Sequence, residues 1–339
     1  MLNRADWEEP GAFEVMPGVY RIPLPLPNDA LRTVNVYAIV SSAFITLIDA
    51  GWAIAETATA LQSALASIGA TLRDIRQVAV THSHRDHYTF TAELKERFGV
   101  TVFLGKGEKP TLDVVMDPDH ARLEPHIATL RSLGADELAD RIAVTRNQAP
   151  LTAGWHLPDK WLADGYQIDA GRAILTALET PGHTRGHMIF LYSAGQAFFA
   201  GDHVLPHITP SIGYEPAPGR DPLVNYLRSL RKVRQIPDMQ LLPAHGPVLD
   251  SSHKRIDELL DHHDDRLKAC QAAVTSGLTT VPEIAGSLTW TRHKRALTEL
   301  NAFNQMLAVL ETLAHLEVLQ AQGIVQSAII QGIRHFEFV

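Results

Sequence analysis

Three histidines and an aspartate fall within six residues, at His82, His84, Asp86 and His87, directly after the apolar run 78–80. Imidazole nitrogens and carboxylate oxygens are ligands of divalent ions such as zinc, and burying so many of them without a cation would be costly. His82 and His84 are two residues apart in an extended segment, so their side chains share one side of the backbone. Asp86 and His87 follow as the chain turns into a helix. The spacing predicts one metal ion at the first pair and a second ion at the other.

A binuclear site needs further ligands, and three later segments each place one candidate beside a glycine at the end of an apolar run. These candidates are His183, Asp202 and His245. The ends of strands converge at one edge of an open sheet, and glycine allows the backbone to approach closely. Each residue alone could be an ordinary turn residue, but the three together predict the remainder of a metal site.

The full pattern resembles the metallo-β-lactamase-fold hydrolase superfamily over roughly residues 15–250, including Asp49 in the early segment 46–51. The resemblance implies that Asp49 orients a ligand without touching metal. It also implies two ligand sets and a bridge: His82, His84 and His183 for one ion, Asp86, His87 and His245 for the other, and Asp202 between them. The implied cofactor is a pair of divalent ions, Zn²⁺ first, with Mn²⁺ or Fe²⁺ as alternatives.

Asp202 also distinguishes branches of the superfamily. The commonest zinc β-lactamases use cysteine at this place, and the single cysteine here, Cys270, lies far downstream. An aspartate bridge resembles the glyoxalase II-like, lactonase-like and ribonuclease-like branches instead. The expected reaction is therefore attack of a metal-bridging hydroxide on the carbonyl of an ester, thioester or lactone, with a small-molecule acyl substrate.

Four residues are candidates for catalytic roles. Asp86 and Asp202 could pass a proton to the leaving group. His207 and Tyr214 follow the bridge in sequence and could polarise the carbonyl or hold an oxyanion. Three other readings stay open: a metal-dependent endoribonuclease or phosphodiesterase, a mononuclear iron enzyme of the persulfide dioxygenase kind, and a DNA-binding regulator that senses metal.

The elements that must position these residues alternate between strand-like and helix-like segments, which predicts an α/β fold. The resemblance implies a four-layer αβ/βα sandwich for a catalytic domain at 1–250. The expected strands lie at 19–22, 34–40, 44–48, the run before His82 and 100–104, and the helices at 54–68, 88–98 and 221–235. The prolines of segment 23–27 predict a loop outside the sheet.

Residues 106–160 interrupt this alternation and predict a helical cap, with helical pieces at 119–133 and 135–142. In the superfamily this segment often borders the substrate cleft. His120, His126 and His156 are expected to be cap or surface histidines and not metal ligands.

A second domain is expected at 251–339, with helices at 252–273, 280–285 and 301–320 and a β-like tail. Three helices and a terminal ribbon resemble a winged-helix domain. This segment has 8 Lys and Arg against 10 Asp and Glu, a net charge of −2. A face that binds phosphates should be basic, so we expect packing or a homodimer here and no nucleic-acid partner.

Composition limits the remaining possibilities. The chain has 339 residues and a net charge of −8, and its single cysteine excludes an intramolecular disulfide. The first residues are acidic and lack the apolar core of a signal peptide, and no run is long and apolar enough to cross a bilayer. The expectation is a cytoplasmic protein without a membrane partner.

Overall fold

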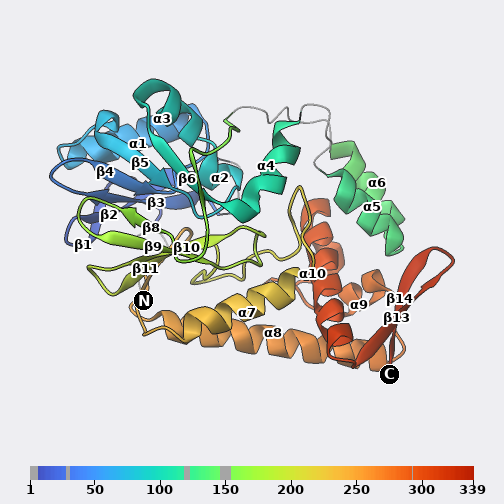
Figure 1. Ribbon diagram of the computed structural model, residues 1–339. Coiled ribbons are helices and arrows are strands. Elements are labelled where there is room, and N and C mark those ends of the chain that lie inside the picture. The colour runs from blue at the N-terminus through green and yellow to red at the C-terminus, as the bar shows by residue number, and fades with distance from the viewer. Residues whose placement is uncertain (1–6, 28–30, 118–122, 146–153, 292) are drawn as a thin grey trace.

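The computed structural model describes residues 7–27, 31–117, 123–145, 154–291 and 293–339. Two β-sheets face each other in the body of the molecule (Figure 1). The first sheet has the order β1-β2-β3-β4-β5-β6-β7. Its strands are β1 (Phe13–Met16), β2 (Val19–Pro25), β3 (Thr33–Val40), β4 (Ile45–Ile48), β5 (Ile75–Ala79), β6 (Thr101–Gly105) and β7 (Lys160–Leu162). The pairs from β1 to β4 are antiparallel and those from β4 to β7 are parallel.

The second sheet has the order β12-β11-β10-β9-β8. Its strands are β8 (Gln167–Asp169), β9 (Ile174–Glu179), β10 (Met188–Tyr192), β11 (Ala197–Gly201) and β12 (Gln240–Pro243). The β11–β12 pair is parallel, whereas the other pairs of this sheet are antiparallel. β11 and β12 therefore end at the same edge, which places Asp202 and His245 side by side in space.

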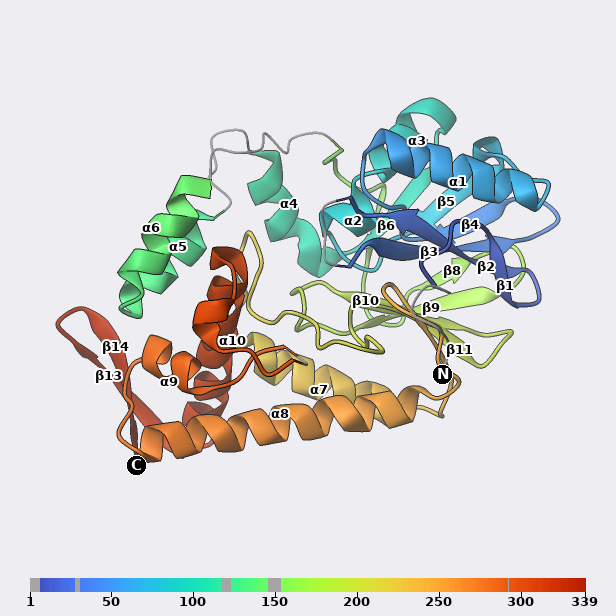
Figure 2. The same cartoon turned by 180° about the vertical axis from the view of Figure 1, so that it is seen from behind.

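Three hydrophobic cores define four layers. The core between the sheets includes Tyr37 of β3 and Phe199 of β11, whose ring centroids are 5.2 Å apart. Helices α1 (Ala55–Ser67) and α3 (Thr91–Phe98) cover the outer face of the first sheet. Helices α7 (Pro222–Arg234) and α8 (Ser252–Thr275) cover the second sheet. The chain is thus an α/β protein with the predicted layer order, helix, sheet, sheet, helix (Figures 1 and 2).

Two local predictions differ from the structure. The loop expected at 23–27 is wrong for residues 23–25, because Pro23 pairs with Asn35 and Pro25 with Thr33 inside β2. β1 pairs only with the first part of β2, so these prolines lie on an edge where no hydrogen-bond donor is needed. The single helix expected at 88–98 is two, α2 (Arg85–Tyr88) and α3, and Gly99 with φ 70° ends the second.

The cap begins with a 3-10 turn, Lys106–Glu108, and continues as α4 (Lys109–Met116), α5 (Glu124–Ser132) and α6 (Asp136–Thr145). Part of the predicted helical piece 119–133 lies outside the described residues, and α4 was not predicted. α5 and α6 pack on the C-terminal α10 (Ala302–Ala321), where Leu130 and Ile142 share a core with Val309 (Figure 2). The cap is therefore held by the C-terminal segment.

The C-terminal segment continues after α8 with α9 (Val281–Ser287), α10 and a hairpin of β13 (Val325–Ile330) and β14 (Ile333–Phe338). Two short 3-10 turns lie at Leu72–Asp74 and Leu297–Glu299. α8 contributes Ile256 to the core under the second sheet and Val274 to the core under the cap. The boundary at 250 and the winged-helix assignment stay predictions. Among the described residues, no helix combines the length and apolar character that a bilayer crossing requires.

Candidate metal centre

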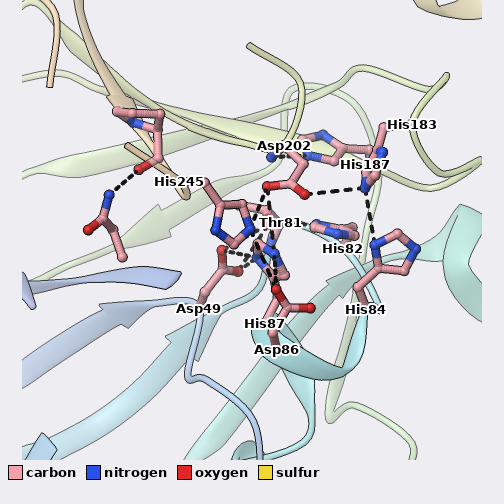
Figure 3. Close-up of polar contacts among 12 residues, drawn as sticks. Asp49, Thr81, His82, His84, Asp86, His87, His183, His187, Asp202 and His245 are labelled. Carbon is pink, nitrogen blue, oxygen red and sulfur yellow. Dashed lines mark hydrogen bonds and ion pairs between the residues drawn. The ribbon is translucent and has the colours of Figure 1, made fainter. Parts of the chain in front are cut away.

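The seven side chains predicted as metal ligands meet at one edge of the two sheets (Figure 3). They form two clusters, and within each cluster the candidate ligand atoms lie within 4.8 Å of one another. The first cluster is His82, His84, His183 and Asp202, and the second is Asp86, His87 and His245. These are the sets that the resemblance implied.

The carboxylate of Asp202 lies between the two clusters. Its Oδ2 is 3.4 Å from Nε2 of His183 in the first cluster. Its Oδ1 is 3.4 Å from Nε2 of His245 and 3.6 Å from Nε2 of His87 in the second. One carboxylate that offers an oxygen to each side has the geometry of a bridging ligand.

Contacts outside the clusters orient the imidazole rings. Nδ1 of His183 lies 2.9 Å from the carbonyl oxygen of Ser211, and Nδ1 of His245 lies 2.8 Å from that of Thr33. A carbonyl only accepts hydrogen bonds, so each Nδ1 carries the proton and donates it. Nε2 then keeps a lone pair that faces the centre, as in metal-bound histidines generally.

Several buried atoms at the centre have no hydrogen-bond partner among the described residues. They are Nε2 of His82, His87 and His245, and Oδ1 of Asp202. Buried polar atoms are rarely left unpaired, and these four converge on the space between the clusters. Nε2 of His84 is also without a partner, and its Nδ1 faces Nε2 of His183 at 3.1 Å. This donor set fits a pair of divalent cations.

Burial and neighbouring charges shift the pKa values of the cluster in opposite directions. Burial lowers the pKa of His82 well below its usual range and that of His84 to about 3. Burial also opposes the charged form of His87, but Asp86, Asp49 and Asp202 outweigh it and raise the pKa of His87 to about 10. Neutral imidazole is the form that binds metal, so the first cluster is ready for an ion, whereas an ion at the second cluster must displace a proton.

Asp49 organises the ligands from the end of β4. Its Oδ2 lies 2.8 Å from Nδ1 of His87. Its Oδ1 accepts the backbone N–H of Thr81 at 2.7 Å, and the Thr81 hydroxyl also donates to the carboxylate. Oγ1 of Thr81 lies 3.1 Å from Nδ1 of His82. One carboxylate therefore orients a ligand of each cluster, directly for His87 and through Thr81 for His82.

We expect Asp49→Asn to weaken metal binding about 10–100-fold, the usual cost of losing a partner behind a metal-binding histidine. In this variant an amide nitrogen replaces one of the two carboxylate oxygens of Asp49. That nitrogen cannot accept the hydrogen bond that Thr81 N–H or His87 Nδ1 now donates. Competition with a chromophoric chelator measures the affinity. Asp113→Asn, at an exposed residue that pairs with Lys109, is the matched control, and equal affinities in the two variants would contradict the role of Asp49.

Two residues that sequence reasoning left unassigned shape the bridge. His187 is buried, its Nδ1 lies 2.9 Å from Oγ1 of Thr180, and its Nε2 accepts the backbone N–H of Asp202 at 3.1 Å. Gly201 has φ 50°, and a Cβ there would lie 2.7 Å from Nε2 of His187. The glycine directly before Asp202 was the available signal, because it marks a close approach of the backbone.

The structure places the other candidates outside both clusters. Tyr214 packs between the cap and the C-terminal segment, with its ring 5.1 Å from His126 and 5.2 Å from Phe303. His207 is exposed, and its ring lies 5.3 Å from that of Trp7. The catalytic roles suggested for Tyr214 and His207 stay predictions.

Of the three histidines not expected to bind metal, the two that the structure describes, His126 and His156, lie outside both clusters. His156 stacks on Tyr88 with the ring centroids 5.1 Å apart, and His126 is buried on α5. His120 lies outside the described residues.

Comparison with known proteins gives a consistent picture. The chain is 28% identical over 320 residues to the "Probable metallo-hydrolase YqjP" of Bacillus subtilis, covering 91% of this chain and 93% of that protein. The crystal structure of the metallo-beta-lactamase family protein TTHA1429 from Thermus thermophilus superposes with a TM-score of 0.80 and 27% identity, over 96% of this chain and 100% of that one. A shorter match, 30% identical over 105 residues and 31% of each chain, is to the "Atrochrysone carboxyl ACP thioesterase" of Aspergillus fumigatus.

The sequence model of the Metallo-beta-lactamase superfamily matches residues 30–245. That range contains all seven side chains of the two clusters. With this match, the two facing sheets and the histidine–aspartate site, the chain belongs to the metallo-beta-lactamase superfamily.

Proposed function

We propose that this protein is a binuclear metal-dependent hydrolase that cleaves an ester, thioester or lactone of a small acyl substrate. The observation that carries the proposal is the position of Asp202, with one carboxylate oxygen 3.4 Å from His183 and the other 3.4 Å from His245. Such a carboxylate can hold two cations close together. We expect zinc at both positions, with manganese or iron as alternatives for the same ligands.

A bound pair of divalent ions would supply a water molecule of lowered pKa and a positive docking point for an oxyanion. The side chains of the protein hold that arrangement. Burial opposes the charged forms of Asp86 and Asp202, but the neighbouring histidines outweigh it and lower the pKa of both carboxyls. Both are therefore ionised at neutral pH, so either can accept a proton and pass it to the leaving group.

Thioesters are the first substrates to test. A thiol has an ordinary pKa of about 8.5, so a thiolate can leave without a strong acid beside it. The shorter match to a protein named as an acyl carrier protein thioesterase agrees with an acyl substrate.

Two features weigh against the competing enzymatic readings. A mononuclear iron enzyme would use one cluster, yet Asp86, His87 and His245 make the second cluster complete. A nuclease should offer a basic surface, yet α10 carries Glu311 and Glu317, and Glu317 pairs with Arg334 at 2.8 Å.

The test is a substrate panel on zinc-loaded protein: an acyl-coenzyme A thioester, a lactone, an aryl ester and a phosphodiester, with oxygen uptake measured separately on iron-loaded protein. We expect release of thiol or acid in proportion to bound metal, with at least one carbonyl substrate preferred over the phosphodiester. Preferred cleavage of the phosphodiester, or oxygen uptake at one iron per chain, would refute the proposal.

A further inference from the structure

We propose that Glu108, at the start of the cap, is a positioning residue that ties together the two loops carrying the first-cluster histidines. The inference rests on the proposed metal site and adds a residue to it. Sequence reasoning did not single out Glu108.

The contacts of Glu108 reach both ligand loops. Its carboxylate is fully buried, and it accepts the hydroxyl of Ser83 on Oε2 and the hydroxyl of Thr184 on Oε1. Ser83 stands between His82 and His84, and Thr184 directly follows His183. Burial raises the pKa of this carboxyl, and the nearby backbone N–H groups of Ser83 and Gly186 oppose that rise. One side chain thus fixes the spacing between the loops that supply all three histidines of the first cluster.

The backbone around Glu108 is held just as closely. A Cβ on Gly186 would lie 2.2 Å from the backbone nitrogen of Glu108, and a Cβ on Gly107 would lie 2.7 Å from Cα of Gly186. The turn before α4 and the loop of His183 therefore pack backbone against backbone. This close packing places the Glu108 carboxylate within reach of both loops.

A second buried carboxyl beside Glu108 provides a matched control. Burial and the neighbouring Glu108 raise the pKa of Glu215 to about 8, so its carboxyl is protonated at neutral pH. Glu215 lies beside Thr111 and Arg185, whereas the hydroxyls of Ser83 and Thr184 donate to Glu108. Glutamine has nearly the shape and the neutral charge of that protonated acid. Glu215→Gln therefore introduces a buried amide beside Glu108 and leaves the hydrogen bonds from Ser83 and Thr184 to Glu108 intact.

The experiment measures zinc per chain and zinc affinity in metal buffers for the wild type, Glu108→Gln and Glu215→Gln. Glu108→Gln replaces one accepting oxygen by an amide N–H group, so the hydroxyl at that position can no longer donate there and must turn to accept, which weakens the link to one loop. We expect Glu108→Gln to lose affinity for one of two ions by about 10–100-fold, so that it retains one ion where the wild type and Glu215→Gln hold two. The visible spectrum of cobalt-substituted protein should lose the component from the first cluster.

The melting temperatures of the metal-free wild type and variants are compared as well. They show whether a variant binds metal more weakly because its fold is less stable or because its ligands are less well positioned. Two ions bound to Glu108→Gln with wild-type affinity would overturn the inference, as would equal losses of affinity in both glutamine variants. If Glu108→Gln does not fold, Ser83→Ala and Thr184→Val each remove one tie and should each weaken the same ion, and unchanged affinity in both would overturn the inference. Failure of every carbonyl substrate would refute the proposed function and leave these metal measurements unaffected.

Discussion

The variant Asp202→Ala should bind neither metal ion tightly and should lose hydrolysis by about 10³-fold or more. Loss of a single oxyanion donor from an active site already costs about 10²–10³-fold, and this variant loses the ions themselves. The carboxylate of Asp202 approaches histidines of both clusters, His183 on one side and His245 on the other. Without its charge, two cations would face each other with no shared anion.

Elemental analysis and the substrate panel, applied to the same preparation, measure both losses together. Asp261→Ala, at an exposed aspartate of α8, is the control and should keep two ions and full activity. A metal-free Asp202→Ala protein that still hydrolyses substrate at the wild-type rate would show that the reaction does not depend on this centre.

Removal of metal by a chelator should lower the melting temperature by about 5–10 °C. An ion at 100 times its Kd stabilises the folded state by about 2.7 kcal/mol, and each kcal/mol corresponds to about 2–4 °C for a large domain. The physical cause is the set of unpaired buried atoms, including Nε2 of His82, His87 and His245. Metal satisfies these atoms in the folded protein, and in the unfolded chain water does so.

Differential scanning fluorimetry with and without chelator measures this shift. Re-addition of zinc should restore the original melting temperature, and chelator saturated with calcium should leave it unchanged. Identical melting temperatures for the metal-loaded and metal-stripped proteins would mean that the clusters do not bind ions with useful affinity.

The positions of the candidate ligands could be predicted from sequence because these residues are signalled locally. His82, His84, Asp86 and His87 form a dense motif, and each later ligand follows an apolar strand beside a glycine. The order of the strands in the two sheets then brings the ends that carry these ligands close together. The alternation of strands and helices indicated an α/β fold, and the resemblance to the superfamily implied the order of the four layers.

Other features depend on contacts between distant segments. Pro23 and Pro25 are compatible with β2 only because that part of the strand is an edge, which depends on where β1 ends. α4 was not predicted, and it begins with Pro110 in its first turn, where proline is tolerated. The burial of Glu108 depends on a loop 76 positions later in the chain.

The arrangement of α5 and α6 likewise depends on α10, which shares a core with them. No pattern within 106–160 indicates that partner. The cap was predicted as a helical segment, but the surface that holds it could not be.

Anomalous diffraction at the zinc edge from crystals of the zinc-loaded protein tests the central claim most directly. The account predicts two peaks, one among His82, His84 and His183 and the other among Asp86, His87 and His245, with Asp202 between them. Crystals that contain zinc but show no peak at these side chains would contradict it.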